Sequence, residues 1–208
     1  MLSKKRKREE KKSIFREQKG EMYTQLNPYL SSRWILYILI SQDGSRTYCG
    51  ITTDFVHRFR QHLGLIKGGA RYTKIKKGVT KEGELAWNPV CLVSGWDGSG
   101  EMTRKCEYRM HHSMRYTAFR QWKNQVVFAH KELWHILKKN AGIQYRLLCL
   151  LYFLSEYFKE NNLLQITWFQ KECRQEQLWK NTSVKELFAE PTVFAGILKE
   201  YQHKQTKV

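Results

Sequence analysis

The stretch that decides the fold is Trp34-Ile35-Leu36-Tyr37-Ile38-Leu39, followed after a polar segment by Arg46-Thr47-Tyr48-Cys49-Gly50-Ile51. Between these two apolar runs lies Ser41-Gln42-Asp43-Gly44-Ser45, and Asp-Gly is a strong signal for a tight turn between β-prone runs. The pattern predicts a β-hairpin over residues 33–52. Its first strand, Trp34 to Ile40, is apolar on both faces, which predicts that the strand is covered on both sides.

A helix is predicted directly after the hairpin, because Thr53 or Asp54 can cap its first turn and Gly64 can end it. Asp54, Arg58 and His62 recur every four residues. This spacing places the three polar side chains on roughly one face of the helix. Two tyrosines on a hairpin, beside an arginine and a histidine on the next helix, are a combination that indicates a site.

A glycine-rich basic loop with one aromatic residue comes next. Backbone amides and Lys or Arg side chains in such a loop can follow a phosphate backbone. An ordinary surface loop is the alternative interpretation. The candidate nucleic-acid-binding residues of this loop are Lys67, Arg71, Tyr72, Lys74, Lys76 and Lys77.

The chain beyond the loop predicts a third strand and a second helix. The strand covers residues 87–93, and Pro89 places its start at a sheet edge or at the first residues of the strand. The helix runs from about Glu101 to Tyr116. The order strand, strand, helix, strand, helix is typical of a small α/β domain.

From about residue 121 the sequence becomes helical and aromatic. Helices are predicted over residues 128–139 and 144–158, the second of them apolar almost all round and therefore deeply packed. Residues 163–169 are predicted to be extended. Ser183-Val184-Lys185-Glu186 has the pattern of a capping box, which predicts a short helix.

The chain is strongly basic, with 37 Lys and Arg against 19 Asp and Glu, a net charge of +18 and a pI near 9.8. This surplus indicates a polyanionic partner, most often nucleic acid, with an acidic membrane surface as the competing partner. The cluster Lys4-Lys5-Arg6-Lys7-Arg8 predicts a nuclear-localisation signal or a nucleic-acid-binding arm. The alternative is a solvated tail that no partner recognises specifically. We therefore predict a nuclear location, with the cytoplasm as the alternative.

No apolar run approaches the roughly 18 residues that span a bilayer, and the charged start is unlike a signal peptide. We therefore expect a soluble intracellular protein. The five cysteines are scattered, without a C-x-x-C pair. This pattern argues against a disulfide framework and a structural zinc site, and predicts mostly buried free thiols.

The hairpin and its neighbours resemble the GIY-YIG nuclease superfamily. Ile35-Leu36-Tyr37 and Tyr48-Cys49-Gly50 resemble its paired signature, and ten residues separate the two tyrosines, within the family's usual spacing. Residues 54–62 look like the family's D-x-x-x-R-x-x-x-H segment, and Glu107 looks like its acidic metal ligand. These four elements occur in the family's order over about 75 residues.

The resemblance implies an α/β fold in which a three-stranded mixed or antiparallel sheet is flanked by helices. It predicts a GIY-YIG nuclease domain over residues 31–120. A basic disordered tail over residues 1–30 would precede this domain, and an α-helical C-terminal region over residues 121–208 would follow it.

Within the superfamily, the sequence looks most like the catalytic subunit of the eukaryotic endonuclease that cuts flaps and branched junctions. Residues 68–73 are similar to its basic Gly-Gly-Ala loop, and residues 87–96 resemble its third strand and turn. Residues 146–168 are similar to its helical segment, so that the likeness covers about residues 33–170. That subunit also carries a cysteine-rich zinc module that docks a scaffold partner, and this sequence contains no such cysteines.

Hydrolysis of a phosphodiester bond needs an activated water, stabilisation of charge on the phosphoryl oxygens, and help for the leaving oxygen. The resemblance implies that Glu107 holds one Mg²⁺ or Mn²⁺ ion. Arg58 would donate to the non-bridging oxygens, and Tyr48 or Tyr37 would take the proton of the water. His62 would assist the base or hold a phosphate.

Two other side chains compete for roles in the site. Glu101 is an alternative metal ligand, although a carboxylate at a helix N-terminus is favourable for the helix dipole alone. His111 and His112 are adjacent, and adjacent residues on a helix diverge by about 100°. We therefore predict that these histidines are surface or packing residues.

The leading prediction is a metal-dependent DNA endonuclease that recognises branched or flapped DNA structures and acts in DNA repair and recombination. One alternative is a sequence-specific homing or restriction nuclease. Another is a non-cutting nucleic-acid-binding module on the same fold. DNA is the expected partner, and the sequence indicates neither a scaffold protein nor a homodimer.

Overall fold

The computed structural model describes residues 32–75, 84–129, 142–158, 163–174, 176–179 and 184–189, and single positions or short runs elsewhere. Several predictions lie outside the described residues: the basic cluster at residues 4–8, most of the helix over 128–139, and the side chains of Lys76 and Lys77. Within the described part, no helix is long and apolar enough to cross a membrane.

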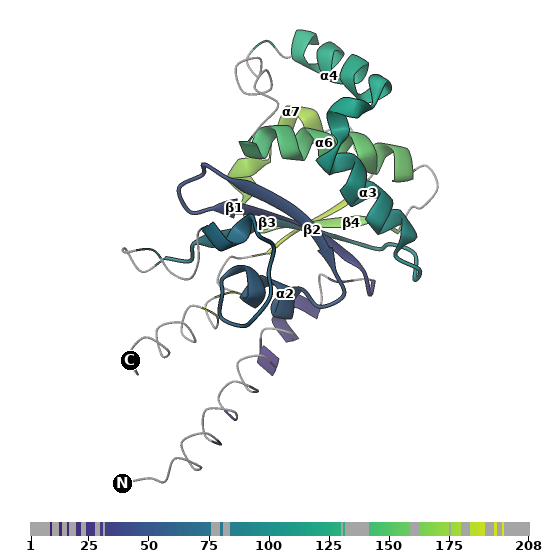
Figure 1. Cartoon of the computed structure of the whole chain (residues 1–208). Helices are drawn as coiled ribbons and strands as arrows, with labels where there is room; N and C mark the ends of the chain where they lie inside the picture. The colour runs from purple at the N-terminus through teal and green to yellow at the C-terminus, as the bar shows by residue number, and fades with distance from the viewer. Residues whose placement is uncertain are drawn as a thin grey trace.

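A five-stranded mixed sheet forms the centre of the fold, in the order β2-β1-β3-β4-β5 (Figure 1). All neighbouring strands are antiparallel except β4 and β5, which are parallel. The strands are β1 Ile35–Ser41, β2 Thr47–Thr52, β3 Trp87–Ser94, β4 Gln165–Trp168 and β5 Lys185–Phe188. The predicted α/β class with helices around and after a mixed sheet is confirmed, but the sheet has five strands instead of three.

The predicted hairpin is confirmed as β1 and β2, with Tyr37 opposite Gly50 in the register. Asp43 holds the turn, because its Oδ1 accepts from the Ser45 backbone N–H at 3.2 Å and from the Ser41 hydroxyl at 2.7 Å. Gly44 has φ +68°, a left-handed conformation that glycine adopts at little cost. The Asp-Gly pair therefore sets the turn, as the sequence predicts.

Helices cover both faces of the sheet (Figure 1). On one side lies α2, Phe55–His62. The helices on the other side are α3 Glu101–His111, α4 Thr117–Ala129, α6 Gly142–Phe158 and α7 Glu176–Trp179.

Strand β1 lies between the two layers, as its apolar sequence predicts. Its residues alternate between two buried clusters. Leu36 and Ile38 pack with the α3 and α6 side chains, whereas Ile35, Tyr37 and Leu39 pack with the α2 side chains. The strand therefore positions Tyr37 on the same face of the sheet as α2.

Strand β3 tolerates Pro89 because this residue lies at an irregularity in the sheet. The register between β1 and β3 shifts between Ile38 and Leu39, where Leu39 faces Pro89. The ladder between β3 and β4 begins only at Cys91. Proline cannot donate a backbone hydrogen bond, so a position beside a bulge and outside the second ladder suits it.

The helix predicted from the capping-box pattern at residues 183–186 is wrong, because residues 185–188 form strand β5. Long-range contacts outweigh the local pattern. Arg174 donates to both carboxylate oxygens of Glu186, at 2.6 and 2.9 Å, and Trp168 Nε1 donates to the same carboxylate at 2.7 Å. The residue that would complete the capping box is therefore engaged by the neighbouring strand.

The remaining predicted elements agree with the structure at their centres and differ at some ends. The apolar helix over 144–158 corresponds to α6, and the extended piece over 163–169 corresponds to β4. Helix α3 ends at His111, earlier than predicted, and a 3₁₀ turn follows over Ser113–Arg115. All five cysteines are free and buried, as expected. The division of the chain at residues 30 and 120 stays a prediction; β3 pairs with β4 across the second boundary.

Candidate active site

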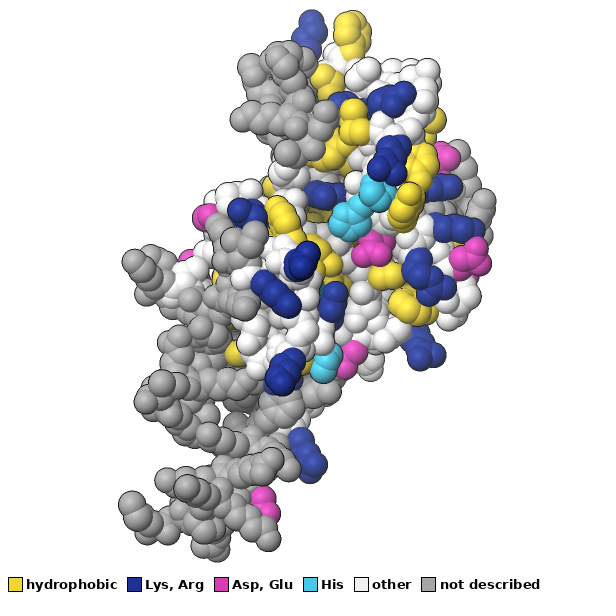
Figure 2. Space-filling view, viewed as in Figure 1, with side chains coloured by type: hydrophobic (Ala, Val, Ile, Leu, Met, Phe, Trp, Pro, Cys, Tyr) yellow, Lys and Arg dark blue, Asp and Glu magenta, His cyan; other side chains and the backbone are white. Residues whose placement is uncertain are grey.

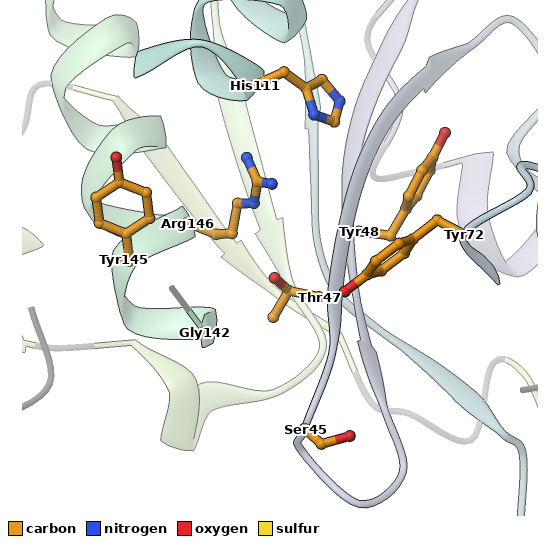
Figure 3. Close-up of a pocket in the computed structure, with 8 residues that line it drawn as sticks. All are labelled: Ser45, Thr47, Tyr48, Tyr72, His111, Gly142, Tyr145 and Arg146. Carbon is orange, nitrogen blue, oxygen red and sulfur yellow. The ribbon is translucent and has the colours of Figure 1, made fainter. Parts of the chain in front are cut away.

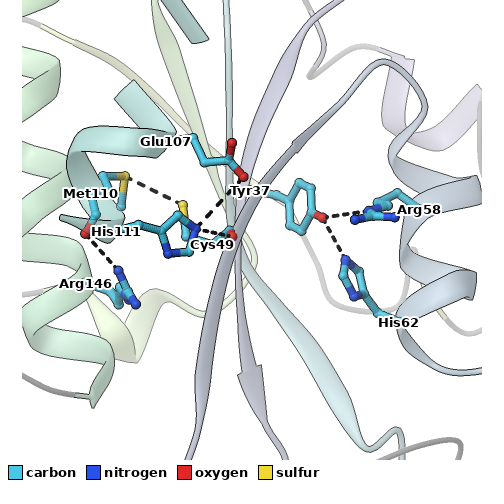
Figure 4. A network of polar contacts seen from close by, with 8 residues as sticks. All are labelled: Tyr37, Cys49, Arg58, His62, Glu107, Met110, His111 and Arg146. Atoms are coloured by element: carbon cyan, nitrogen blue, oxygen red, sulfur yellow. Dashed lines mark hydrogen bonds and ion pairs between the residues drawn. The ribbon is translucent and has the colours of Figure 1, made fainter. Parts of the chain in front are cut away.

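Tyr37 is the buried centre of the polar network on the α2 side of the sheet (Figure 4). Its hydroxyl lies 2.7 Å from His62 Nε2 and 3.2 Å from Arg58 Nε. Arg58 and His62 come from α2, which begins correctly because Asp54 accepts a hydrogen bond from the His57 backbone N–H at 2.9 Å. The predicted four-residue spacing therefore does bring both side chains to the hairpin.

The hydrogen bonds around His62 define which ring nitrogen carries the proton. The Thr73 hydroxyl donates to the Ala70 carbonyl at 3.0 Å, so its oxygen accepts from His62 Nδ1 at 2.8 Å. His62 Nε2 is then unprotonated and accepts the hydroxyl hydrogen of Tyr37, whose oxygen accepts from Arg58. The Tyr37 proton is therefore already committed to His62.

Burial keeps both members of this pair neutral. It raises the pKa of Tyr37 far above its usual value, and it lowers the pKa of His62 to about 3, with the charge of Arg58 acting in the same direction. At neutral pH His62 is an uncharged acceptor that holds Tyr37 in place. This geometry supports a positioning role for His62 rather than phosphate binding.

We expect His62 to make the protein less stable in acid. Its pKa is about 3 in the folded chain and about 6.5 in the unfolded chain, so between these values the unfolded chain binds the extra proton. The free energy of unfolding should therefore fall as pH drops from 6.5 towards 3, by up to about 1.4 kcal/mol per pH unit from this proton. Urea unfolding across this range should show the slope, and His62→Gln should reduce it. An unchanged slope in the variant would contradict the assignment.

Tyr48 lies on β2, the edge strand of the sheet, and is half-buried. Its ring centroid is 4.8 Å from that of His62, 6.1 Å from that of Tyr37 and 6.4 Å from that of His111. Burial raises the pKa of Tyr48, while the charge of Arg58 and its hydrogen bond lower it. Tyr48 is thus the tyrosine that is in reach of groups from both layers.

Gly50 provides the space in which the two tyrosines meet. A Cβ at this position would lie 2.5 Å from the Tyr37 hydroxyl oxygen and 2.9 Å from Tyr48 Cε1. Because Tyr37 is fully buried and hydrogen-bonded, its ring has no free space to move into. The last glycine of the second tripeptide is therefore required by close packing against the tyrosines.

Replacing Gly50 by alanine should destabilise the protein by about 1–3 kcal/mol, as overpacking of a filled core does. The same change should displace the Tyr37 hydroxyl from His62. Thermal unfolding measures the first effect, and Gly98→Ala is the comparison, because Gly98 is an exposed turn residue with nothing near its Cβ and no left-handed φ. A Gly50→Ala protein as stable as the wild type would contradict this packing argument.

Glu107 approaches the same strand from the other layer, on α3 (Figure 4). It is half-buried, and burial raises its pKa while the charge of Arg58 lowers it. Its Oε1 lies 4.0 Å from Nε2 of His111, one turn further along α3. The competing Glu101 is exposed and pairs with Lys105 at 2.6 Å. The geometry therefore favours Glu107 as the acidic member of the site.

Residues 33–94 match the GIY-YIG catalytic domain. A GIY-YIG domain is present. The chain is also similar to a UPF0213 protein of Cupriavidus necator, with 40% identity over 57 residues, 27% of this chain and 59% of the relative. A UPF0213 protein of Cupriavidus pinatubonensis is 42% identical over 55 residues, 26% of this chain and 58% of the relative. The chain spans less than two thirds of the length of these curated relatives.

The match to a catalytic domain supports the predicted nuclease class. Nucleases of this kind are generally dependent on a divalent metal. Within the described residues, no three His, Cys, Asp or Glu side chains cluster as a metal site. Mg²⁺ is often held by one or two carboxylates together with waters and substrate phosphate, so the half-buried carboxylate of Glu107 fits such an ion as a single protein ligand.

The basic loop of the GIY-YIG domain is presented to solvent next to α2. Lys67, Arg71, Tyr72 and Lys74 are exposed. The loop is held close to α2, because a Cβ at Gly69 would lie 2.6 Å from the Gln61 carbonyl oxygen. Lys and Arg side chains clearly outnumber acidic ones on the face in Figure 2. The location of these residues is consistent with a surface for a polyanion.

Two residues near the site were missed in the sequence. His111 was predicted to be a surface or packing residue; its Nε2 donates to the Cys49 carbonyl at 3.1 Å, so it packs against the hairpin beside the site. Arg146 on α6 donates from Nη1 to the Met110 carbonyl at 2.9 Å. One signal was available for Arg146, because it is the only Lys or Arg in the apolar segment that forms α6.

Proposed function

We propose that this protein is a divalent-metal-dependent DNA endonuclease that cuts branched or flapped DNA. The observation that carries the proposal is the meeting of two layers at the edge strand. Arg58, Tyr37 and His62 interact with Tyr48 from the α2 side, and Glu107 on α3 interacts with it electrostatically from the other side. The GIY-YIG domain supplies the class of reaction.

The arrangement assigns a separate task to each side chain. Arg58 is half-buried, and in the described part of the chain it hydrogen-bonds to Tyr37, Tyr48 and Gln61, none of which is a carboxylate. Its guanidinium can therefore donate to the non-bridging oxygens of a phosphate. Tyr37, which is itself hydrogen-bonded to His62, accepts from Arg58 Nε and so positions the guanidinium.

Tyr48 is the tyrosine placed to accept a proton from the attacking water. The hydroxyl proton of Tyr37 is donated to a buried histidine, whereas Tyr48 is half-buried at the sheet edge. Tyr48 would accept the proton of the water as its phenolate. Burial raises the pKa of Tyr48, and the charge and hydrogen bond of Arg58 oppose that effect by favouring the phenolate. Glu107 would hold the Mg²⁺ or Mn²⁺ ion, which when bound neutralises phosphate charge and supports the leaving oxygen.

The preference for branched DNA is supported by the charge of the chain and by its resemblance to the structure-specific eukaryotic subunit. A surplus of basic side chains binds the phosphate backbone without reading bases. Such an activity would belong to DNA repair and recombination. The basic cluster Lys4-Lys5-Arg6-Lys7-Arg8 supports a nuclear location, which a fluorescent fusion with and without the cluster would test.

The test is cleavage of flap, splayed-arm, four-way-junction and plain duplex DNA with Mg²⁺, using the wild type and Glu107→Gln. We expect the wild type to cut the branched substrates preferentially and the variant to cut none. Cleavage of plain duplex at one sequence would favour a homing or restriction nuclease. Binding of all substrates without cutting would identify a non-cutting module.

A further inference from the structure

A pocket of about 410 Å³ opens beside the candidate active site (Figure 3). It lies between the β1–β2 hairpin, the basic loop, the end of α3 and the start of α6. Tyr48 and His111 form the wall that it shares with the site, and Tyr145 and Arg146 on α6 form the opposite wall. The volume is near the lower end of the range for small-molecule pockets, which suits one nucleotide rather than a stack of base pairs.

The chemistry of the walls suits a nucleotide. Tyr48 and Tyr72 present aromatic rings to the pocket, and stacking on aromatic rings binds bases of any sequence. Thr47 contributes a hydroxyl that can hydrogen-bond to a base edge or a sugar. None of the described residues that line the pocket is acidic, so no carboxylate opposes the entry of a phosphate.

Arg146 brings a positive charge to this pocket. It is half-buried and donates to the Met110 carbonyl, and among the described residues it has no carboxylate partner. Its charge lowers the pKa of His111, although burial of the histidine is the larger cause. A guanidinium has five N–H donors, and only one is needed for the carbonyl at the end of α3. The remaining donors can bind a phosphate.

Tyr72 is an exposed aromatic ring at the rim of the pocket, with 43% of its surface accessible. The Arg46 guanidinium lies 5.4 Å from its ring centroid. An exposed tyrosine between basic residues is an arrangement that stacks on a base and attracts its phosphate. A base paired inside a duplex cannot present its face in this way, so the pocket selects an unpaired base.

We propose that this pocket binds one unpaired nucleotide of the strand being cut, next to the scissile phosphate, with Tyr72 stacked on its base and Arg146 bound to its phosphate. This rests on the proposed function for the identity of the strand. It also gives a physical reason for cutting at junctions: a strand can fill the pocket only where at least one nucleotide is unpaired.

The experiment uses the full chain with Glu107→Gln, so that binding is measured without cleavage. The probe is a splayed-arm DNA that carries 2-aminopurine at successive positions of one strand, compared with a matched duplex at the same salt concentration. Stacking quenches 2-aminopurine fluorescence, and we expect quenching at one position or two adjacent positions near the branch. Quenching spread evenly along the strand would overturn the proposal.

Variants then assign the quenching to the pocket. Tyr72→Ala should remove it and weaken splayed-arm binding roughly 10- to 100-fold, whereas Tyr72→Phe should retain both. Arg146→Gln keeps an N–H donor for the Met110 carbonyl but loses the charge, and should weaken splayed-arm binding about 10-fold. Duplex binding should change less than about twofold in each case. Lys185→Gln, an exposed position on β5 at the opposite sheet edge, controls for loss of net charge.

Two outcomes would overturn the proposed nucleotide-binding role of the pocket. One is unchanged quenching in Tyr72→Ala. The other is an equal loss of duplex and splayed-arm binding in both Tyr72→Ala and Arg146→Gln. Thermal unfolding of each variant shows whether a loss comes from the fold. A wild type that cuts no DNA but keeps the localised quenching would overturn the proposed hydrolysis and support the pocket. A wild type that cuts without localised quenching would overturn the pocket alone.

Discussion

Glu107→Gln should abolish strand cleavage, by a factor of about 10³ or more, and leave the protein folded. The loss follows from removal of the only carboxylate that the described structure places beside Tyr48 and Arg58, since metal-based charge stabilisation contributes several kcal/mol. Burial raises the pKa of Glu107, so the charged carboxylate lowers the free energy of unfolding. The melting temperature of the variant should therefore equal or exceed that of the wild type.

The matched control is Glu101→Gln, on the same helix. Glu101 is exposed and pairs with Lys105, and an exposed pair four residues apart contributes only about 0.3–0.5 kcal/mol. Cleavage by this variant should stay within about twofold of the wild type. Single-turnover rates on a flap substrate distinguish the two carboxylates. A large loss in Glu101→Gln with a small loss in Glu107→Gln would reverse the metal assignment.

The second large effect is expected from the two tyrosines, which should respond differently to loss of a hydroxyl. Tyr48→Phe should lower the cleavage rate by about 10² to 10⁴, the usual range for a general base, with little change in stability. Tyr37→Phe should lower the free energy of unfolding by about 1–3 kcal/mol, because buried His62 loses its donor. Its cleavage rate should fall too, since Arg58 loses the Tyr37 oxygen.

Paired measurements of unfolding and single-turnover cleavage make this contrast testable. The pH dependence of the cleavage rate distinguishes the two tyrosines better than the size of the rate loss does. If Tyr48 is the base, its loss in Tyr48→Phe should flatten the rise of the rate with pH, and Tyr37→Phe should keep this rise. If Tyr37→Phe flattens the profile and Tyr48→Phe keeps it, Tyr37 is the base and the assignment is reversed.

The parts of the site that lie close together in sequence were predictable. The Asp-Gly turn, the Asp54 cap and the spacing of Arg58 and His62 depend on local geometry, and each is found as predicted. Glu107 was identified through a resemblance. The structure gives a physical reason to prefer Glu107 to Glu101 as the metal ligand. The Glu107 carboxylate is half-buried at the hairpin, whereas the Glu101 carboxylate is exposed and paired with Lys105.

The parts that were not predictable depend on contacts between distant segments. Strand β5 forms because residues 165–168 offer it a parallel partner, and no local pattern contains that information. His111 reaches the Cys49 carbonyl only because α3 crosses the hairpin. Arg146 lies near the site because α6 packs on α3, where it reaches the Met110 carbonyl.

The edge position of β2 determines how much chain a working enzyme needs. Residues 33–94, which match the GIY-YIG catalytic domain, carry both tyrosines, Arg58 and His62. They lack Glu107, and they lack α3 and α6, which cover Leu36 and Ile38 on the second face of the sheet. A graft of this segment into another protein would transfer the site without Glu107. It would also leave the apolar face of the sheet that α3 and α6 cover exposed to solvent. The proposed site is therefore incomplete in the matched segment alone, and a minimal fragment that could cut DNA must extend at least through α6.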